Sequence, residues 1–259
     1  MTNGLLTGIY IYPVKSCGSI SVSKIHGNQS GLDGDRQWVV LGGGDNVLTQ
    51  RDYSSMSLIQ PTLLDENGYK LKLEAPNMPP IKVEHCEDKD RFCEIDIWDN
   101  DRTGYDQGNE VALWLSDYLK TEARLLYTKV GETKDARYVD CSPLLIISEE
   151  SLGQLNTQVE DPVRMSRFRP SLVVKGLGEF LEDKVSSLKV GETRLNGIKL
   201  CGRCVMINID QENGIMTGSE PLRTLSKYRK EGGKVMFGRY FECDRDFDFS
   251  LGMTISAEL

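Results

Sequence analysis

The sequence of 259 residues predicts a mainly β (α+β) fold with a few short helices. Most apolar stretches alternate apolar and polar residues with the period of two that is typical of a half-buried strand. Glycine-rich turns separate several of these stretches. Only three segments carry the spacing of an amphipathic helix. Many short strands with few helices favour a closed or sandwiched antiparallel sheet over a parallel, doubly wound one.

Strand-like segments occur along the whole chain. In the first half they are residues 8–14 (GIYIYPV), 36–41 (RQWVVL), 69–75 (YKLKLEA) and 93–98 (CEIDIW). In the second half they are residues 124–128, 143–148, 171–176, 205–210 (VMINID), 234–242 and 253–259. The three glycines at 42–44 predict a hairpin turn. The polar stretch around Gly131–Asp135 predicts an exposed loop or a domain boundary.

Three helices are predicted from apolar stripes. Residues 110–120 place one stripe at helical spacing, formed by Val111, Trp114, Leu115, Tyr118 and Leu119. Residues 148–158 begin with Ser148 as the predicted N-cap. Residues 220–230 have Pro221 near their start and one apolar face, formed by Leu222, Leu225 and Tyr228.

The chain carries a formal net charge of −8 at pH 7. Sequence-independent binding to nucleic acid or anionic lipid needs basic surface, so we expect neither a nucleic-acid nor a membrane partner. No apolar run approaches a membrane span, and the start lacks a basic segment followed by an apolar one, so we expect no signal peptide. The seven cysteines are an odd, irregularly spaced set. These features together predict a cytoplasmic protein with reduced thiols.

Two cysteines three residues apart, in Cys201-Gly-Arg-Cys204, directly precede the predicted strand at 205–210. A structural zinc site needs four nitrogen or sulfur ligands, and the two histidines of the chain lie far upstream. A redox dithiol of the thioredoxin kind needs a helix after the motif, where this sequence predicts a strand. Cys201 is explained as a small apolar residue at a strand entrance. Cys204 stands next to Arg203, and an adjacent guanidinium favours the thiolate, which is the metal-binding form.

Cationic side chains recur at turn-like or strand-end positions of this acidic chain, near small or hydroxyl residues. They are Lys15, Arg36, Arg51, Arg167, Arg169 and Arg203. An arginine fork binds phosphate through two hydrogen bonds, and small neighbours let backbone N–H groups approach the same oxygens. Each cation alone is better explained by a surface salt bridge. Together they are compatible with a site for a phosphorylated cofactor.

Five motifs follow one another along the chain: YPVKSC, GLDGDRQWVV, YVDCSPLLIISEESLGQLN, SRFRPSLVV, and CGRCVMINIDQENG with SEPLRTLSKYR and FGRYF behind it. In this order they resemble the MOSC-domain proteins that carry a MOSC-associated N-terminal β-barrel domain. The amidoxime-reducing component family and the C-terminal region of molybdenum cofactor sulfurases are similar in this way. The resemblance implies two β-barrel-like halves, residues 1–125 and 126–259, with a cofactor in the cleft between them. It allows the first strands to pack with the C-terminal half.

The resemblance also implies a cofactor, the molybdenum-pyranopterin (molybdenum cofactor). The family motif makes Cys204 the metal ligand and catalytic residue, and thiolate suits a soft metal. The implied cofactor-binding residues are Lys15, Ser16 and Arg36 on the pterin, Arg169 at its phosphate end, and Cys141, Ser142, Ser171, Gly202 and Arg203 along the cofactor. Ser171 stands where relatives carry an asparagine, so this position departs from the family pattern.

The activity implied by the resemblance is reduction of N-hydroxylated small molecules, such as amidoximes and hydroxylamines. The chain has no iron–sulfur, flavin or nicotinamide motif, so we expect electrons from a separate ferredoxin-, flavin- or haem-type protein. The alternative is a module that binds or carries molybdenum cofactor or sulfur without turnover, with Cys201 or Cys204 as the acceptor.

Overall fold

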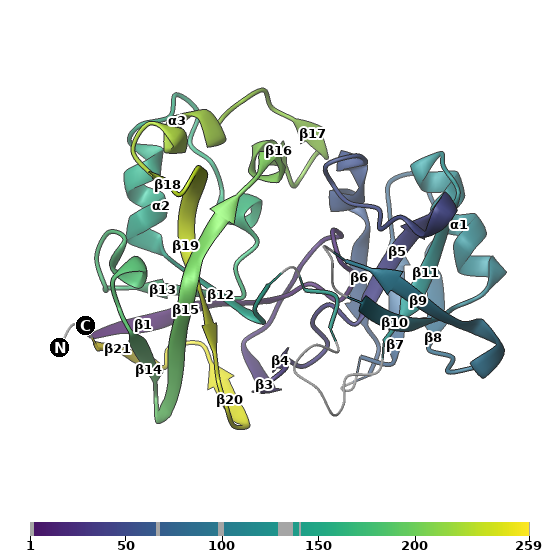
Figure 1. Ribbon diagram of the computed structural model, residues 1–259, viewed down its shortest axis with the longest axis horizontal. Helices are drawn as coiled ribbons and strands as arrows, with labels where there is room; N and C mark the ends of the chain where they lie inside the picture. The colour runs from purple at the N-terminus through teal and green to yellow at the C-terminus, as the bar shows by residue number, and fades with distance from the viewer. Residues whose placement is uncertain (1–2, 66–67, 98–100, 129–136, 140, 259) are drawn as a thin grey trace.

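The computed structural model describes residues 3–65, 68–97, 101–128, 137–139 and 141–258. Strands dominate these residues and form two halves joined side by side, so the prediction of a mainly β fold is confirmed (Figure 1). The predicted polar loop around Gly131–Asp135 lies outside the described residues. Within them, no helix is long and apolar enough to cross a membrane.

The larger half is a closed barrel of seven strands. In ring order they are β12 (Leu144–Ser148), β13 (Leu172–Lys175), β1 (Asn3–Ile11), β21 (Thr254–Glu258), β14 (Ser187–Val190), β15 (Thr193–Arg203) and β19 (Lys234–Glu242), which pairs back to β12. Neighbours are antiparallel except β12 and β13. Strand β1 lies between β13 and β21. The first strand of the chain is therefore part of the C-terminal barrel, as the resemblance allowed.

Alternation along these strands fills the barrel. In β1 the side chains of Asn3, Leu5 and Thr7 are exposed, whereas Leu6 and Ile9 are completely buried. They meet Ile146, Leu188 and Phe241 from other barrel strands in one apolar cluster. Burying apolar surface is favourable by about 25 cal/mol per Å², so closing the sheet on itself stabilises every strand at once. Smaller strands extend or cap this half: β2 (Ile20–Ser21), β3 (Lys24–Asn28), β4 (Gly31–Leu32), β16 (Ile209–Asp210), β17 (Ile215–Met216), β18 (Lys230–Glu231) and β20 (Phe247–Ser250).

The smaller half consists of two sheets around one apolar core. A four-stranded sheet has the order β5 (Trp38–Gly42), β11 (Ala123–Tyr127), β10 (Asp101–Asp106) and β9 (Phe92–Asp96). A three-stranded sheet has the order β6 (Gln60–Leu63), β7 (Lys70–Glu74) and β8 (Ile81–Glu84). Trp38, Leu71 and Leu115 belong to the shared core. Strand β11 runs through residue 125, the predicted domain boundary, and pairs with β5 along its whole length.

The three predicted helices exist. They are α1 (Asn109–Leu119), α2 (Glu149–Asn156) and α3 (Leu222–Ser226). The apolar stripe predicted on α1 is buried except for Tyr118, which is partly buried, and Ser148 caps α2 by accepting a hydrogen bond from the backbone N–H of Ser151. Helix α3 is shorter than predicted, because the chain has to leave the helix before Lys230, where β18 begins and pairs with β19.

The predicted strand at 205–210 is wrong for most of its length. Val205–Asn208 form a turn of 3-10 helix, and only Ile209–Asp210 form a strand. The backbone carbonyl of Asn208 accepts hydrogen bonds from Arg167 (3.0 Å) and from the Thr217 hydroxyl (2.8 Å). The backbone N–H of Thr217 donates to the same carbonyl (2.9 Å), so strand pairing begins only at the end of the predicted segment. The apolar alternation instead reflects Ile207 entering the core beside an exposed Val205.

The cap of α2 gives a stability prediction. Ser148→Ala removes the acceptor of a buried N-cap hydrogen bond of 3.0 Å. We expect the free energy of unfolding in urea to fall by about 1 kcal/mol. Thr157→Ala is the control, because that hydroxyl donates to the Gln154 carbonyl on the exposed surface, and we expect a change within about 0.5 kcal/mol. Equal losses in both variants would contradict the capping argument.

Candidate functional site

The residues predicted to bind a cofactor line two adjoining hollows in the cleft between the halves. The smaller hollow, of about 80 Å³, is lined by Lys15, Ser16, Arg36, Cys141, Ser142, Arg169 and Ser171 among others. The larger one, of about 980 Å³, is lined by Gly202, Arg203 and Cys204 among others. They share walls formed by Arg36, Arg51, Cys141, Leu145, Arg169, Met206 and Tyr240. The structure therefore brings all ten predicted residues together, and their roles toward a ligand stay a prediction.

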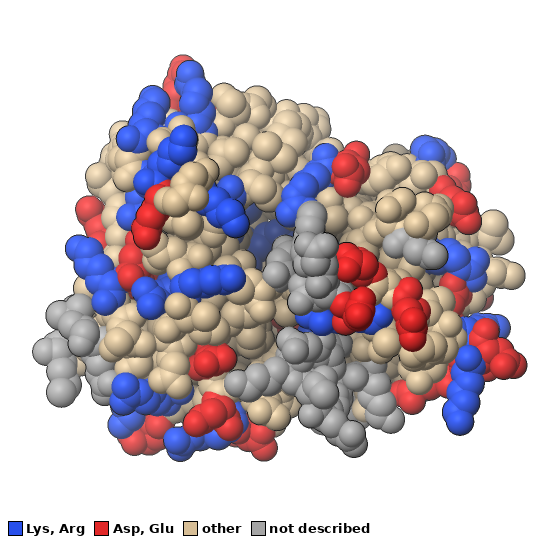
Figure 2. Space-filling view, in the orientation of Figure 1, with Lys and Arg blue, Asp and Glu red and all other residues tan. Residues whose placement is uncertain are grey.

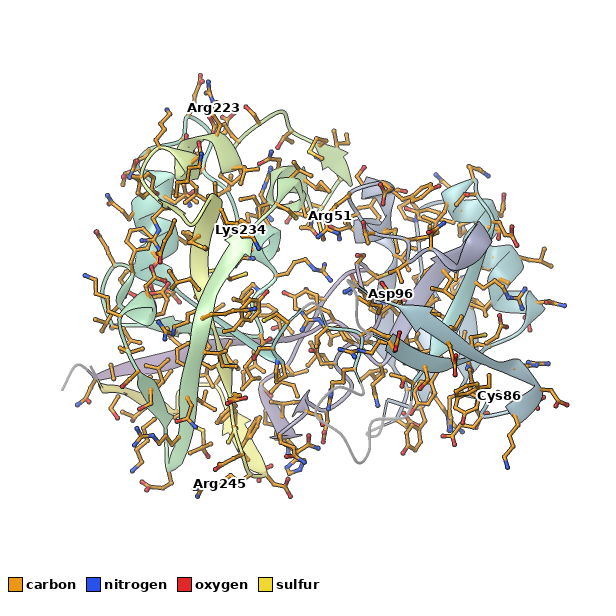
Figure 3. The ribbon with its side chains drawn as sticks, in the orientation of Figure 1. Arg51, Cys86, Asp96, Arg223, Lys234 and Arg245 are labelled. Carbon is orange, nitrogen blue, oxygen red and sulfur yellow. The ribbon has the colours of Figure 1, made fainter. Side chains whose placement is uncertain are left out.

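Positive charge gathers in this cleft of an acidic chain. The larger hollow is lined by the cations Arg36, Arg51, Arg167, Arg169, Lys199, Arg203, Lys234 and Arg239, against Asp183 and Glu231 as acids. Blue side chains surround and enter the hollow between the halves in Figure 2. Arg51 from the smaller half and Lys234 from the barrel lie on either side of the gap in Figure 3. Such a field concentrates anionic ligands.

Three of the predicted residues hold an unusual backbone conformation. Ser16, Arg36 and Arg169 have φ values of 66°, 48° and 52°. This left-handed region costs a residue with a side chain about 1 kcal/mol or more. Only six described residues other than glycine adopt it, so three of them at one cleft are a marked concentration. Strain of this kind persists where surrounding contacts fix it, which is typical of ligand-binding sites.

Tyr12 holds two of the arginines together. The guanidinium carbon of Arg36 lies over its ring at 4.4 Å from the ring centre, and that of Arg169 at 4.2 Å. Its hydroxyl donates to the Pro170 carbonyl (3.0 Å), and its backbone N–H donates to Asp35 (2.7 Å). Burial raises the pKa of Tyr12 to about 12, so the ring stays neutral and offers a π face to each cation.

Further contacts fix each arginine. Arg36 pairs with the buried carboxylate of Asp35. Arg169 donates to the Cys17 carbonyl (2.7 Å), and burial lowers the pKa of Arg169. Arginine nevertheless stays protonated in proteins, so both guanidinium groups carry their charge into the cleft. Two like charges on one ring favour an anion that lies against both.

Cys201 and Cys204 differ sharply in environment. Both line the larger hollow, but Cys201 is only 3% exposed and packs in an apolar cluster with Phe237 and Leu225, whereas Cys204 is partly exposed. Cys204 precedes the 3-10 helix Val205–Asn208, so the sequence argument against a dithiol, which assumed a strand there, does not hold. All seven cysteines are free thiols in this structure. Only Cys204 of the pair offers its sulfur to a ligand.

Arg203 has a different use from the one expected. Its Nε and Nη1 donate to the carbonyls of Phe237 and Phe168, both at 2.8 Å, rather than serving the thiol of the next residue. Its Nη2 is buried and has no partner among the described residues. A buried donor without an acceptor costs about 1–3 kcal/mol, more for a charged group. Because Arg203 lines the larger hollow, this nitrogen fits an anionic ligand.

The two serines at the cofactor positions are engaged with the protein. The hydroxyl of Ser142 donates to the Phe241 carbonyl (2.9 Å). The hydroxyl of Ser171 donates to the Pro143 carbonyl and accepts from the backbone N–H of Leu145, both at 3.3 Å. Ser171 thus fastens the start of β12.

The donor set fits a ligand that brings its own metal ligands. Within the described residues, no three His, Cys, Asp or Glu side chains come together to hold a metal ion. The cleft instead offers two accessible thiols, at Cys141 and Cys204, beside guanidinium groups and an unpartnered donor of Arg203. A phosphorylated, metal-bearing organic cofactor fits this set.

Comparison with known proteins agrees with the motif order. Residues 3–122 match the family model of the MOSC N-terminal beta barrel domain, and residues 133–256 match the MOSC domain. Mitochondrial amidoxime reducing component 2 of Rattus norvegicus is 35% identical, covering 93% of this chain and 80% of the relative. The chain is a MOSC-domain protein of the amidoxime-reducing component family.

Other members of the family are similar at the same level. Mitochondrial amidoxime-reducing component 1 of Xenopus laevis is 30% identical, covering 92% of this chain and 77% of the relative. Molybdenum cofactor sulfurase of Oryza sativa subsp. japonica is 31% identical over 90% of this chain, which corresponds to 32% of that longer protein.

Several residues of this MOSC-family cleft were not assigned from the sequence. Arg51 belonged to the cationic set but received no role, and it lines both hollows. Tyr12 was missed, because nothing in the alternation of YIYPV distinguishes a core tyrosine from one that stacks on two arginines. Arg239 and Lys234 belong to β19, where the sequence pattern alone would place charged residues on the solvent-facing side of the strand.

The buried Cys17 gives a reactivity prediction. Burial raises the pKa of the Cys17 thiol to about 12, and the residue is completely buried. Since thiolate is the reactive form, iodoacetamide at pH 8 should modify the exposed Cys141 and leave Cys17 unmodified, as read by peptide mass spectrometry. Unfolding in urea should expose Cys17 fully. Modification of Cys17 at the Cys141 rate in folded protein would contradict its burial.

Proposed function

We propose that the protein binds a molybdenum cofactor in this cleft and reduces N-hydroxylated small molecules, such as amidoximes and hydroxylamines. The observation that carries the proposal is the convergence of ten predicted residues, scattered between Lys15 and Cys204, on two adjoining hollows rich in cations. Relatives named amidoxime reducing component support the substrate class. The cytoplasmic location expected from composition stays a prediction.

The anionic part of the cofactor would be held by cations that the fold already fixes. Arg36 and Arg169 both stack on the Tyr12 ring, and Lys15 is held by its Nζ donating to the Tyr138 carbonyl (3.1 Å). Arg203 would give its unpartnered Nη2. Because these groups are placed before the ligand arrives, little ordering entropy is lost on binding.

Cys204 would give its thiolate to the metal. When bound, the molybdenum cofactor supplies a metal centre that exchanges two electrons and an oxygen atom with the substrate. The chain supplies the shape around that centre. Met206, Met236 and Leu200 line the larger hollow and offer apolar surface to the organic part of a substrate. Electrons would come from a separate ferredoxin-, flavin- or haem-type protein.

A carrier of molybdenum cofactor or sulfur is the second candidate. The similarity to a molybdenum cofactor sulfurase over 90% of the chain favours it. Cys141, which is exposed and lines both hollows, and Cys204 are two thiols that a carrier could load. A carrier binds the same cofactor in the same cleft but does not turn over substrate.

The ligand assignment is tested with two cysteine variants produced in a host that makes molybdenum cofactor. We expect Cys204→Ser to abolish turnover of benzamidoxime with reduced viologen and to change the Mo(V) resonance, because the metal loses its protein thiolate. Cys201→Ser is the matched control and should leave both nearly unchanged, because that sulfur packs in the core. Identical behaviour of the two variants would overturn the assignment.

Enzyme and carrier are separated by the choice of electron donor. We expect no turnover of benzamidoxime with NADH alone, and turnover with reduced viologen that depends on Cys204. Molybdenum bound at about one per chain without turnover from any donor would instead favour the carrier, which should then pass cofactor to an apo-molybdoenzyme. Folded protein that holds neither molybdenum nor pterin would overturn both functions.

A further inference from the structure

A completely buried glutamine links the two halves at the cleft. Gln50 lies in the turn between Thr49 and Arg51, both of which line the smaller hollow. Its Nε2 donates to the Ser16 carbonyl (2.8 Å) and to the side-chain oxygen of Gln211 (3.0 Å). Gln211 donates back to the Gln50 side-chain oxygen (3.0 Å). Both N–H bonds of the Gln50 amide and its carbonyl oxygen are therefore used.

One end of this link belongs to the candidate site, and the other end follows a site residue in the chain. Ser16 is one of the strained residues predicted to hold the pterin. Gln211 follows Cys204 after the 3-10 helix Val205–Asn208 and the short strand Ile209–Asp210. The link joins residues 161 positions apart in the chain. One buried side chain thus fixes the Ser16 segment relative to the segment that carries Cys204.

Other residues of the barrel and of the smaller half also bond the segment after Cys204. The contacts described next do not involve a predicted cofactor-binding residue of the smaller half. From the barrel, Arg167 donates to the Asn208 carbonyl (3.0 Å) and pairs with Asp210 (3.3 Å). From the smaller half, the Ser54 hydroxyl donates to the Gly214 carbonyl (2.6 Å). Gln50 differs because the same amide nitrogen bonds both Ser16 and Gln211.

We propose that Gln50 is a positioning residue, whose side-chain amide fixes Cys204 relative to Ser16 across the cleft. Amide bonds suit this task because they have direction and carry no charge that would compete with an anionic ligand. Loss of the amide leaves the Ser16 carbonyl and the Gln211 side chain without their partners, so the Cys204 segment opens more often. The consequence for turnover rests on the proposed function, whereas the link itself does not.

The test measures opening of the Cys204 segment without a cofactor. Full-length chain from a host that makes no molybdenum cofactor is treated with iodoacetamide at pH 8, and each cysteine is followed by peptide mass spectrometry. We expect Gln50→Leu, which removes three hydrogen bonds, to raise the Cys204 rate by about five-fold or more, since one lost bond corresponds to about five-fold, while Cys17 stays unmodified. Gln50→Glu, of the same shape but without N–H donors, should also raise it.

A matched glutamine provides the control. Gln60 donates from its Nε2 to the Ser19 carbonyl (2.7 Å) in an exposed position and does not line either hollow of the cleft. Gln60→Leu should leave the Cys204 rate within about two-fold of the unaltered protein, since no bond to the Cys204 segment is lost. An unchanged Cys204 rate in Gln50→Leu would overturn the proposal. So would equal acceleration at Cys17 and Cys204, because that pattern reports general unfolding.

Two further measurements keep the proposal independent of folding and of the proposed function. If Gln50→Leu does not fold, Gln211→Leu breaks the link from the other end, and an unchanged Cys204 rate in it overturns the proposal. In cofactor-loaded protein, Gln50→Leu should alter the Mo(V) resonance and lower kcat with reduced viologen more than it raises KM. Absence of molybdenum from the unaltered protein would overturn the proposed function and leave the alkylation result standing.

Discussion

The cleft depends on how strand β1 is paired. Antiparallel hydrogen bonds to β13 and β21 fix β1 in the wall of the C-terminal barrel, although it is the first strand of the chain. The residues after it leave the barrel and enter the smaller half, where the backbone N–H of Lys15 donates to the Trp38 carbonyl (2.8 Å). Tyr12, Lys15 and Ser16 lie on this crossing. Because both ends of the crossing are hydrogen-bonded, its side chains are held in the cleft and not on a free linker.

That crossing explains why charge can be concentrated there. Two guanidinium groups on one ring repel each other and lose water, so an unsupported pair would move apart. The Tyr12 ring, the Asp35 carboxylate and the Cys17 carbonyl offset this repulsion with directed contacts. The left-handed backbone of Ser16, Arg36 and Arg169 is explained in the same way. Its conformational cost is offset by the contacts that the surrounding residues make. The site is thus built before a ligand enters.

The sequence predicted most regular elements because their signals are local. The stripe on α1, the Ser148 cap and the alternation of β19 each need only a window of about ten residues. The same rule failed at Val205–Asn208, where a 3-10 helix carries the same apolar pattern and the Asn208 carbonyl is bonded by Thr217 and by Arg167, 41 positions away in the chain. Motif order pointed to ten residues that converge on the cleft, and their roles toward a cofactor stay a prediction. It did not find Gln50, which contacts a residue 161 positions away in the chain. It also did not find Tyr12, which stacks with arginines from two separate segments.

Different residues therefore determine the charge of this cleft and the geometry of its two walls. The cations that line it recruit an anion, and a bound anion would pull both walls toward itself, because attraction of this kind has no preferred direction. A thiolate ligand is more demanding, since a metal accepts it only within a narrow range of distance and angle. A link made of neutral, directed hydrogen bonds can set that range without changing the charge of the site. The buried amide pair of Gln50 and Gln211 has these properties, and it stands between the segment that gathers charge and the segment that carries the sulfur.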